Sequence, residues 1–162
     1  MSSKVVWGVM LAAALVGYLR PSSNRSTPNT RTAAMAQATD KALATVIERS
    51  PDGHFYVNAL VNDNLIRFLV DTGASSIALT KADAQAAGIP VNPANVEIVA
   101  RGASGDVRGA RVNIHHIAIG QKEAWDLPSV VITDDMDVSL LGQSYLSQIA
   151  SVSIMNDKMI LE

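Results

Sequence analysis

An aspartate that directly follows an apolar run is the residue of this chain best placed to do chemistry. Residues 68–70 are Phe-Leu-Val and lead into Asp71-Thr72-Gly73, and a second apolar run, 77–79, leads away. A carboxylate at the end of a buried strand needs a strong partner, because burying it unpaired is costly. Gly73 lets the backbone turn sharply at this point. The pattern predicts that Asp71 is half of a catalytic carboxylate pair; the alternative is an ordinary Asp/Gly turn.

Two strands and a tight turn are expected to carry Asp71 to its place. Residues 54–61 are rich in β-forming types, 62–64 are Asn-Asp-Asn, and 65–70 have the pattern of a second strand. This arrangement predicts a β-hairpin whose second strand ends on the Asp71 loop. After the loop, 80–88 begins with a Thr cap and ends with a Gly, which predicts one short helix.

A glycine-containing hairpin is predicted in the middle of the chain. Strand-like segments cover 96–99 and 107–119, and residues 100–106 between them include Gly102 and Gly105. We expect a mobile hairpin tip there, because glycines and small residues constrain the backbone weakly. The tip is either a surface loop without a role or a flap that covers a bound ligand.

The last part of the chain is expected to supply a second strand-to-helix junction and a terminal hairpin. Pro128 lies in the strand-like segment 125–133, so any strand there is expected at an edge or with a late start. Leu140-Leu141-Gly142 is followed by a predicted short helix over 143–149. Residues 152–161 have the pattern of a hairpin.

The amino-terminal part is predicted to lie outside the folded domain. Residues 5–19 are uncharged, and this run is intermediate in length between a signal-peptide core and a full membrane span. We favour an uncleaved single-pass anchor over 1–20. A partly disordered linker, 21–43, follows, and the folded domain covers 44–162, with 44–48 as a possible first strand.

Composition excludes several classes of function. The formal net charge is −2, the pI is about 5.9 and aromatic residues make up 4% of the chain, so nothing favours nucleic-acid binding. Cysteine is absent, which excludes disulfides and thiol nucleophiles. The histidines His54, His115 and His116 lack metal-ligand spacing, and the acidic run 134–137 lacks the glycine and distal Glu of a calcium loop. We expect no metal and no cofactor.

Together these residues resemble the retropepsin-like (retroviral-type) aspartic proteases, and in particular bacterial membrane-anchored members. The resemblance covers about residues 50–162. It rests on four segments: Gly53-His54-Phe55-Tyr56-Val57, Phe68-Leu69-Val70-Asp71-Thr72-Gly73-Ala74-Ser75, Ala103-Ser104-Gly105 and Leu140-Leu141-Gly142. It implies an all-β, single-lobed closed barrel of the acid protease fold, with one or two short helices and a preceding amino-terminal transmembrane helix.

The resemblance also assigns roles to residues. It makes Asp71 the catalytic carboxylate of the active-site loop Asp71-Thr72-Gly73-Ala74, in which Thr72 grips the partner's loop and Gly73 lines the substrate backbone. Leu140-Leu141-Gly142 would brace this loop, and Ala103-Ser104-Gly105 would form the flap. The flap departs from the family pattern, because Ser104 stands where related sequences tend to carry Asn.

The chemistry of that family requires two aspartates. Two carboxylates about 3 Å apart share one proton, so that one accepts a proton from water while the other donates to the scissile carbonyl. The chain contains no second Asp-Thr-Gly or Asp-Ser-Gly, and Asp52 and Asp106 lack the apolar approach of Asp71. The expectation is therefore a symmetric homodimer that hydrolyses polypeptides.

Two other functions stay open. The same scaffold could hold an extended peptide by strand addition without cutting it. Alternatively, the chain could be an envelope tether whose Ala-rich segment binds a partner. Localisation is open as well: the resemblance favours the bacterial inner membrane with a periplasmic domain, whereas Arg20, Arg25 and Arg31 favour a cytoplasmic domain.

Overall fold

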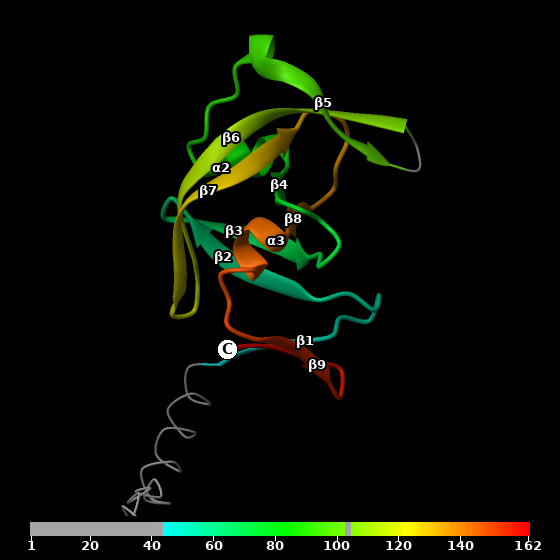
Figure 1. Ribbon diagram of the computed structural model, residues 1–162, viewed down its shortest axis with the longest axis vertical. Helices are drawn as coiled ribbons and strands as arrows, with labels where there is room; N and C mark the ends of the chain where they lie inside the picture. The colour runs from blue at the N-terminus through cyan, green and yellow to red at the C-terminus, as the bar shows by residue number, and fades with distance from the viewer. Residues whose placement is uncertain (1–43, 103–104) are drawn as a thin grey trace, which may run out of the picture.

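The hairpin that leads to Asp71 forms as the alternating pattern requires. The computed structural model of the chain describes residues 44–102 and 105–162 (Figure 1). In it, β2 (Tyr56–Val61) and β3 (Asn64–Val70) pair antiparallel along their whole length. Their turn residues Asn62 and Asp63 both have positive φ, the conformation that a two-residue hairpin turn needs. The predicted hairpin is therefore confirmed.

The other elements follow the expected order. They are β1 (Thr45–Glu48), β4 (Ile77–Leu79), α2 (Lys81–Ala86), a 3-10 turn (Pro93–Asn95), β5 (Val96–Gly102), β6 (Gly105–Ile119), β7 (Lys122–Ile132), β8 (Ser139–Leu141), α3 (Gln143–Leu146), β9 (Val152–Met155) and β10 (Lys158–Leu161). Helix α2 starts at the predicted cap, where the Thr80 hydroxyl accepts a hydrogen bond from the Asp83 N–H. The first strand and the terminal hairpin are confirmed too.

The main sheet closes on itself. Its strand order is β2-β3-β8-β4-β7-β6-β5, and a further pairing of β2 with β6 joins the two ends into a barrel, leaving β5 outside the closed part. This pairing covers the edge of β2 that an open sheet would leave exposed, so that β5 is the edge strand that remains. The expectation of an all-β closed barrel with few short helices is confirmed.

A smaller sheet brings the two ends of the described domain together. It has the order β1-β10-β9, and it lies beside the barrel at the bottom of Figure 1. Its Ile47, Met159 and Leu161 are buried and join the barrel core. The chain segments before β2 and after α3 are thus tied to each other and to the same core.

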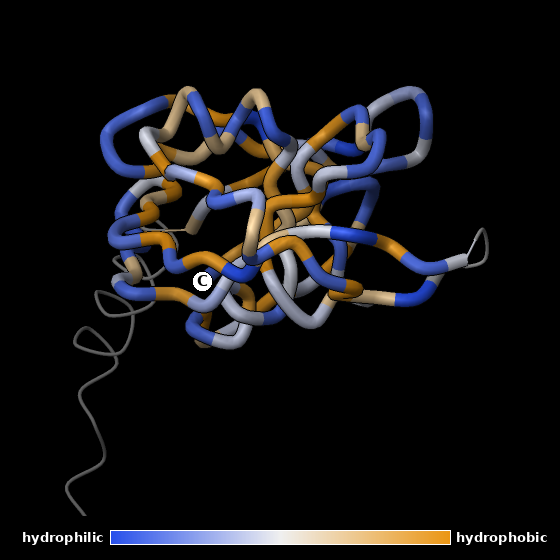
Figure 2. The backbone as a smooth tube through the Cα atoms, turned by 90° about the horizontal axis from the view of Figure 1, so that it is seen from above, coloured by the Kyte–Doolittle hydropathy of each residue, from blue (hydrophilic) through white to orange (hydrophobic). Residues whose placement is uncertain are grey.

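The core lies inside the barrel. Figure 2 shows hydrophobic segments gathered in the middle and hydrophilic ones at the peripheral turns. The largest fully buried side chains come from eight elements: Val61, Phe68, Ile77, Leu79, Ile114, Ile117, Ile119, Val131, Leu141, Tyr145, Met159 and Leu161. Burial of these apolar surfaces is the main favourable term that fixes the strands around the Asp71 loop.

One prediction about strands is wrong. β7 is neither an edge strand nor late to start, because it begins at Lys122 and pairs with β6 on one side and β4 on the other. Pro128 is tolerated since the pairing with β4 begins only at Ser129, so that at Pro128 the strand has β6 alone as its neighbour.

The middle hairpin is longer than the sequence indicated. β5 and β6 extend through most of 100–106 and pair up to Gly102 and Gly105. The remaining residues, 103 and 104, lie outside the described part of the chain. The predicted anchor at 5–19 and the linker at 21–43 lie outside it as well, and among the described residues no helix is long and apolar enough to cross a membrane.

Candidate active site

Asp71 lies where β3 ends, at a junction between three strands. Its backbone N–H donates to the Leu141 carbonyl oxygen at 3.1 Å, which continues the parallel pairing of β3 with β8. Val70 before it is buried, whereas Asp71 itself is half-buried. The strand thus delivers the carboxylate from the core to the surface at a fixed point.

A hydrogen bond to the Asp71 carboxylate stabilises the turn that follows β3. The Gly73 N–H donates to Asp71 Oδ1 at 2.9 Å, and the Ala74 N–H donates to the Asp71 carbonyl oxygen at 3.2 Å. An Asp side chain that bonds the backbone two residues on is the usual way in which this residue type fixes a turn. Thr72 and Gly73 are exposed, so the turn presents its backbone at the surface.

Strand β8 is inserted between the two strands that flank this loop. Leu140 pairs with Leu69 of β3 on one side and with Ala78 of β4 on the other. Leu141 is fully buried and anchors β8 in the core. Of the predicted bracing residues, these two hold the loop by fixing both of its ends.

Gly142 braces the loop through close contact. Its Cα lies so near the loop that an added Cβ would overlap the Ser76 carbonyl oxygen and lie 2.8 Å from the Ala74 carbonyl oxygen. Only a residue without a side chain allows this approach. The predicted bracing segment therefore contacts the predicted active-site loop in the structure.

Two further residues of the brace were missed in the sequence. The Gln143 N–H donates to the Ala74 carbonyl oxygen at 2.8 Å, and its side-chain Nε2 donates to the Thr72 carbonyl oxygen, also at 2.8 Å. The Ser144 Oγ accepts a hydrogen bond from the Ile77 N–H at 2.9 Å. The available signal was their position directly after Gly142, but their partners lie far away in the sequence.

The predicted flap is only partly described. Gly105 begins β6, while Ala103 and Ser104 lie outside the described residues. Near the tip, Arg101 Nε and Asp106 Oδ1 form an exposed ion pair at 2.9 Å. In Figure 1 the β5–β6 hairpin extends from the barrel toward the same side as the end of β3.

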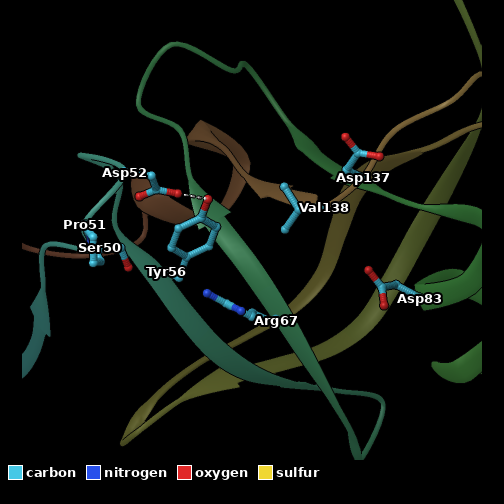
Figure 3. A pocket seen from close by; sticks show the side chains of 8 residues that line it. All are labelled: Ser50, Pro51, Asp52, Tyr56, Arg67, Asp83, Asp137 and Val138. Atoms are coloured by element: carbon cyan, nitrogen blue, oxygen red, sulfur yellow. Dashed lines mark hydrogen bonds between the residues drawn. The ribbon is translucent and has the colours of Figure 1, made fainter.

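A cavity of about 620 Å³ is lined by residues other than those of the Asp71 loop (Figure 3). Asp52, Tyr56 and Arg67 line one side, and Asp83 and Asp137 line the other. Hydrogen bonds from the His54 N–H and the Tyr56 hydroxyl hold the pKa of Asp52 below its ordinary value. None of its lining residues belongs to the predicted site, and the described residues contain no cluster of His, Asp and Glu that could hold a metal ion.

Comparison with known proteins gives a consistent set of matches. Residues 57–148 match the family described as gag-polyprotein putative aspartyl protease. An uncharacterised protein, RP867 of Rickettsia prowazekii (strain Madrid E), is 41% identical over 116 residues, which cover 72% of this chain and 50% of that protein. An uncharacterised protein in the cobV 5′ region of a Sinorhizobium species is 34% identical over 115 residues, covering 70% and 49%. The chain thus spans about half the length of these curated relatives.

Solved structures agree with the sequence matches. A retropepsin-like aspartic protease from Rickettsia conorii superposes with a TM-score of 0.61 at 38% identity, over 73% of this chain and 88% of that one. The EIAV protease complexed with the inhibitor HBY-793 superposes with a TM-score of 0.50 at 19% identity, over 65% and 97%. At that identity the second likeness concerns the fold alone.

Proposed function

Since the chain belongs to the retropepsin-like aspartic protease family, we propose that it is an aspartic endopeptidase whose site is formed by two copies of Asp71 in a homodimer. The observation that carries the proposal is the geometry of the Asp71 loop. A half-buried carboxylate is held by its own glycine turn, is braced by β8 and α3, and lies beside exposed backbone. A carboxylate held in this way needs little reorganisation when charge develops on the substrate.

In the proposed reaction the two carboxylates share one proton. The ionised Asp71 takes a proton from water as the water oxygen bonds to the scissile carbonyl carbon, and the protonated Asp71 gives its proton to the carbonyl oxygen. The tetrahedral intermediate then returns a proton to one carboxylate while the leaving nitrogen receives one from the other. Cleavage of the C–N bond yields an acid and an amine and restores the shared proton.

A second copy of the chain is part of the proposal because one chain has a single such loop. Thr72 and Gly73 are exposed in the isolated chain, as residues of a shared site would have to be. Exposed apolar side chains also occur on the terminal sheet, where Val46, Ile154 and Met155 are each at least half exposed. Both features support an isologous interface.

The second candidate is a peptide-binding module on the same scaffold. Such a module would gain nothing from a carboxylate held at the loop, and a bound peptide would survive intact. Substituting Asp71 separates the two functions, because binding would persist in the module whereas cleavage would disappear in the enzyme.

The test is the substitution Asp71→Asn in the full chain. An amide cannot accept the proton of the attacking water, so we expect cleavage of a fluorogenic peptide library to fall roughly a thousandfold or more. Asp135→Asn is the matched control, because Asp135 is exposed in a surface turn and should leave turnover unchanged. Undiminished cleavage by the Asp71→Asn protein would contradict the assignment.

We propose separately that the apolar run near the amino terminus anchors the protein in a membrane. Residues 5–19 would insert as a single-pass helix in a bacterial inner membrane, with the domain on the periplasmic side. Protease added outside spheroplasts should then degrade the domain. If the domain is degraded only after the membrane is dissolved, the domain faces the cytoplasm instead. If a salt wash releases the protein from the membrane, residues 5–19 are not an anchor.

A further inference from the structure

Gln143 contacts the active-site loop on both sides of Gly73. Its side-chain Nε2 donates to the Thr72 carbonyl oxygen at 2.8 Å, and its backbone N–H donates to the Ala74 carbonyl oxygen at 2.8 Å. The residue is exposed at the start of α3, so its side chain does not fill the core. The side-chain contact joins residues that are 71 positions apart in the chain.

The side-chain contact acts on the same peptide unit that bonds the Asp71 carboxylate. The Thr72 carbonyl and the Gly73 N–H belong to one planar peptide group, so fixing the direction of one fixes the other. The Gly73 N–H donates to Asp71 Oδ1 at 2.9 Å. A donor on the Thr72 oxygen also polarises this peptide group and strengthens its N–H as a donor.

We propose that Gln143 is a positioning residue, whose side-chain amide holds the Thr72–Gly73 peptide plane and thereby orients the Asp71 carboxylate. The expected effect on turnover rests on the proposed function. The orientation of the Asp71 carboxylate by Gln143 depends only on the hydrogen bonds of the loop. Other contacts fix the ends of the loop: Leu141 holds Asp71, and Ser144 holds Ile77. Gln143 acts between these ends, at the peptide next to the carboxylate.

The decisive variant is Gln143→Met, which keeps the length of the side chain and removes the donor. Its backbone N–H can still bond Ala74, so α3 should remain in place. We expect kcat to fall about tenfold with KM changed less than about twofold, because a misdirected carboxylate affects the reaction more than substrate binding. The acidic limb of the pH–rate profile should move to higher pH, since the carboxylate loses part of its hydrogen bond.

Two further variants separate positioning from a general effect of the substitution. Gln85→Met makes the same chemical change on an exposed residue of α2, which belongs neither to the loop and its brace nor to the terminal sheet. It should leave kcat and the pH profile as in the unmodified protein. Gln143→Arg keeps an N–H donor on a long side chain and should retain kcat within about threefold.

The Gly73 amide itself gives a readout that does not depend on activity. In Gln143→Met, NMR should show an upfield shift of the Gly73 amide proton and about fivefold faster hydrogen exchange. If the unmodified protein cleaves nothing, the proposed function fails while this amide measurement still decides the geometry. If the Gly73 amide, kcat and pH profile of Gln143→Met match those of Gln85→Met, the inference about Gln143 is overturned.

Discussion

The Asp71 loop and the β5–β6 hairpin are both chain reversals with glycines, yet they are held in opposite ways. The Asp71 loop has bonds to Leu141, Gln143 and Ser144, which come from a different part of the chain. The pairing of β6 with β7 ends at Gly109, and Arg108 next to it still bonds Thr133 and Asp134. From Val107 to the tip, the described part of the β5–β6 hairpin pairs with itself. The Asp71 loop is thus fixed by contacts from other elements, whereas the β5–β6 hairpin is attached to the barrel only at its base.

This difference matches what each region would have to do in a protease. A reacting carboxylate must be kept within a fraction of an ångström of its working position, which requires contacts from several elements. A hairpin that covers an extended peptide must be able to move away, and a hairpin whose outer part is paired only with itself can do so. We infer that the fold separates a rigid region from a movable one, and each of the following substitutions tests one side of this comparison.

Gly142→Ala should have the largest effect, because it breaks the brace of the rigid region. A Cβ there would overlap the Ser76 carbonyl oxygen and approach the Ala74 carbonyl oxygen, both of which are backbone atoms. We expect a loss of about 3 kcal/mol in the free energy of unfolding, measured by urea denaturation, together with loss of turnover. Gln148→Ala is the control, and equal stability of the two proteins would disprove the brace.

Gly109→Ala makes the same change at the base of the movable region. The added Cβ would lie 2.6 Å from the Val131 carbonyl oxygen and 3.0 Å from Val99 Cγ2. Because the clash lies where the hairpin leaves the barrel, we expect a loss of about 1–2 kcal/mol and a rise in KM that exceeds the fall in kcat. A fall in kcat alone, measured by steady-state kinetics, would contradict a substrate-covering role for this hairpin.

Tyr145→Phe should have the smallest effect, and that effect should depend on pH. The Tyr145 hydroxyl donates to the Lys122 carbonyl oxygen at 2.9 Å, and burial raises the pKa of this fully buried residue to about 12. At neutral pH the substitution should cost about 1 kcal/mol.

The raised pKa of Tyr145 determines the alkaline behaviour. Folding favours the neutral phenol, so its contribution is complete below pH of about 10, the ordinary pKa of tyrosine, and is lost as the pH rises toward 12. Thermal unfolding at several pH values should therefore show the gap between the two proteins closing over that range. A gap of constant size would contradict the role assigned to burial.

The sequence predicted most strands, because their signals are local. Alternation in β2 and β3, the Thr80 cap and the apolar approach to Asp71 all lie within a few residues of what they determine. A closed barrel was expected only from the family resemblance, and the local patterns did not show that β2 and β6 close it, since this pairing depends on how a long strand curves across the whole molecule. Pro128 misled the prediction because its missing N–H matters only where β4 is present.

The sequence motif of the candidate site could be predicted, but the hydrogen bonds that hold its loop in place could not. Asp71 and Leu140-Leu141-Gly142 were recognised as segments, whereas the hydrogen bonds of Gln143 and Ser144 depend on the distance between two loops. An exposed Gln after a glycine is an ordinary helix start in a single sequence. The role of Gln143 can be recognised only in the structure, where its side chain lies beside the Thr72 carbonyl oxygen.

The most direct test of the central claim is to mix unmodified chains with Asp71→Asn chains and measure turnover per unmodified chain. Energy transfer between labelled chains would show that they exchange partners. If the site needs two copies of Asp71, a ninefold excess of the variant should lower activity per unmodified chain to about one tenth, because most would pair with an inactive partner. Activity that stays constant while the chains demonstrably exchange would contradict a shared site.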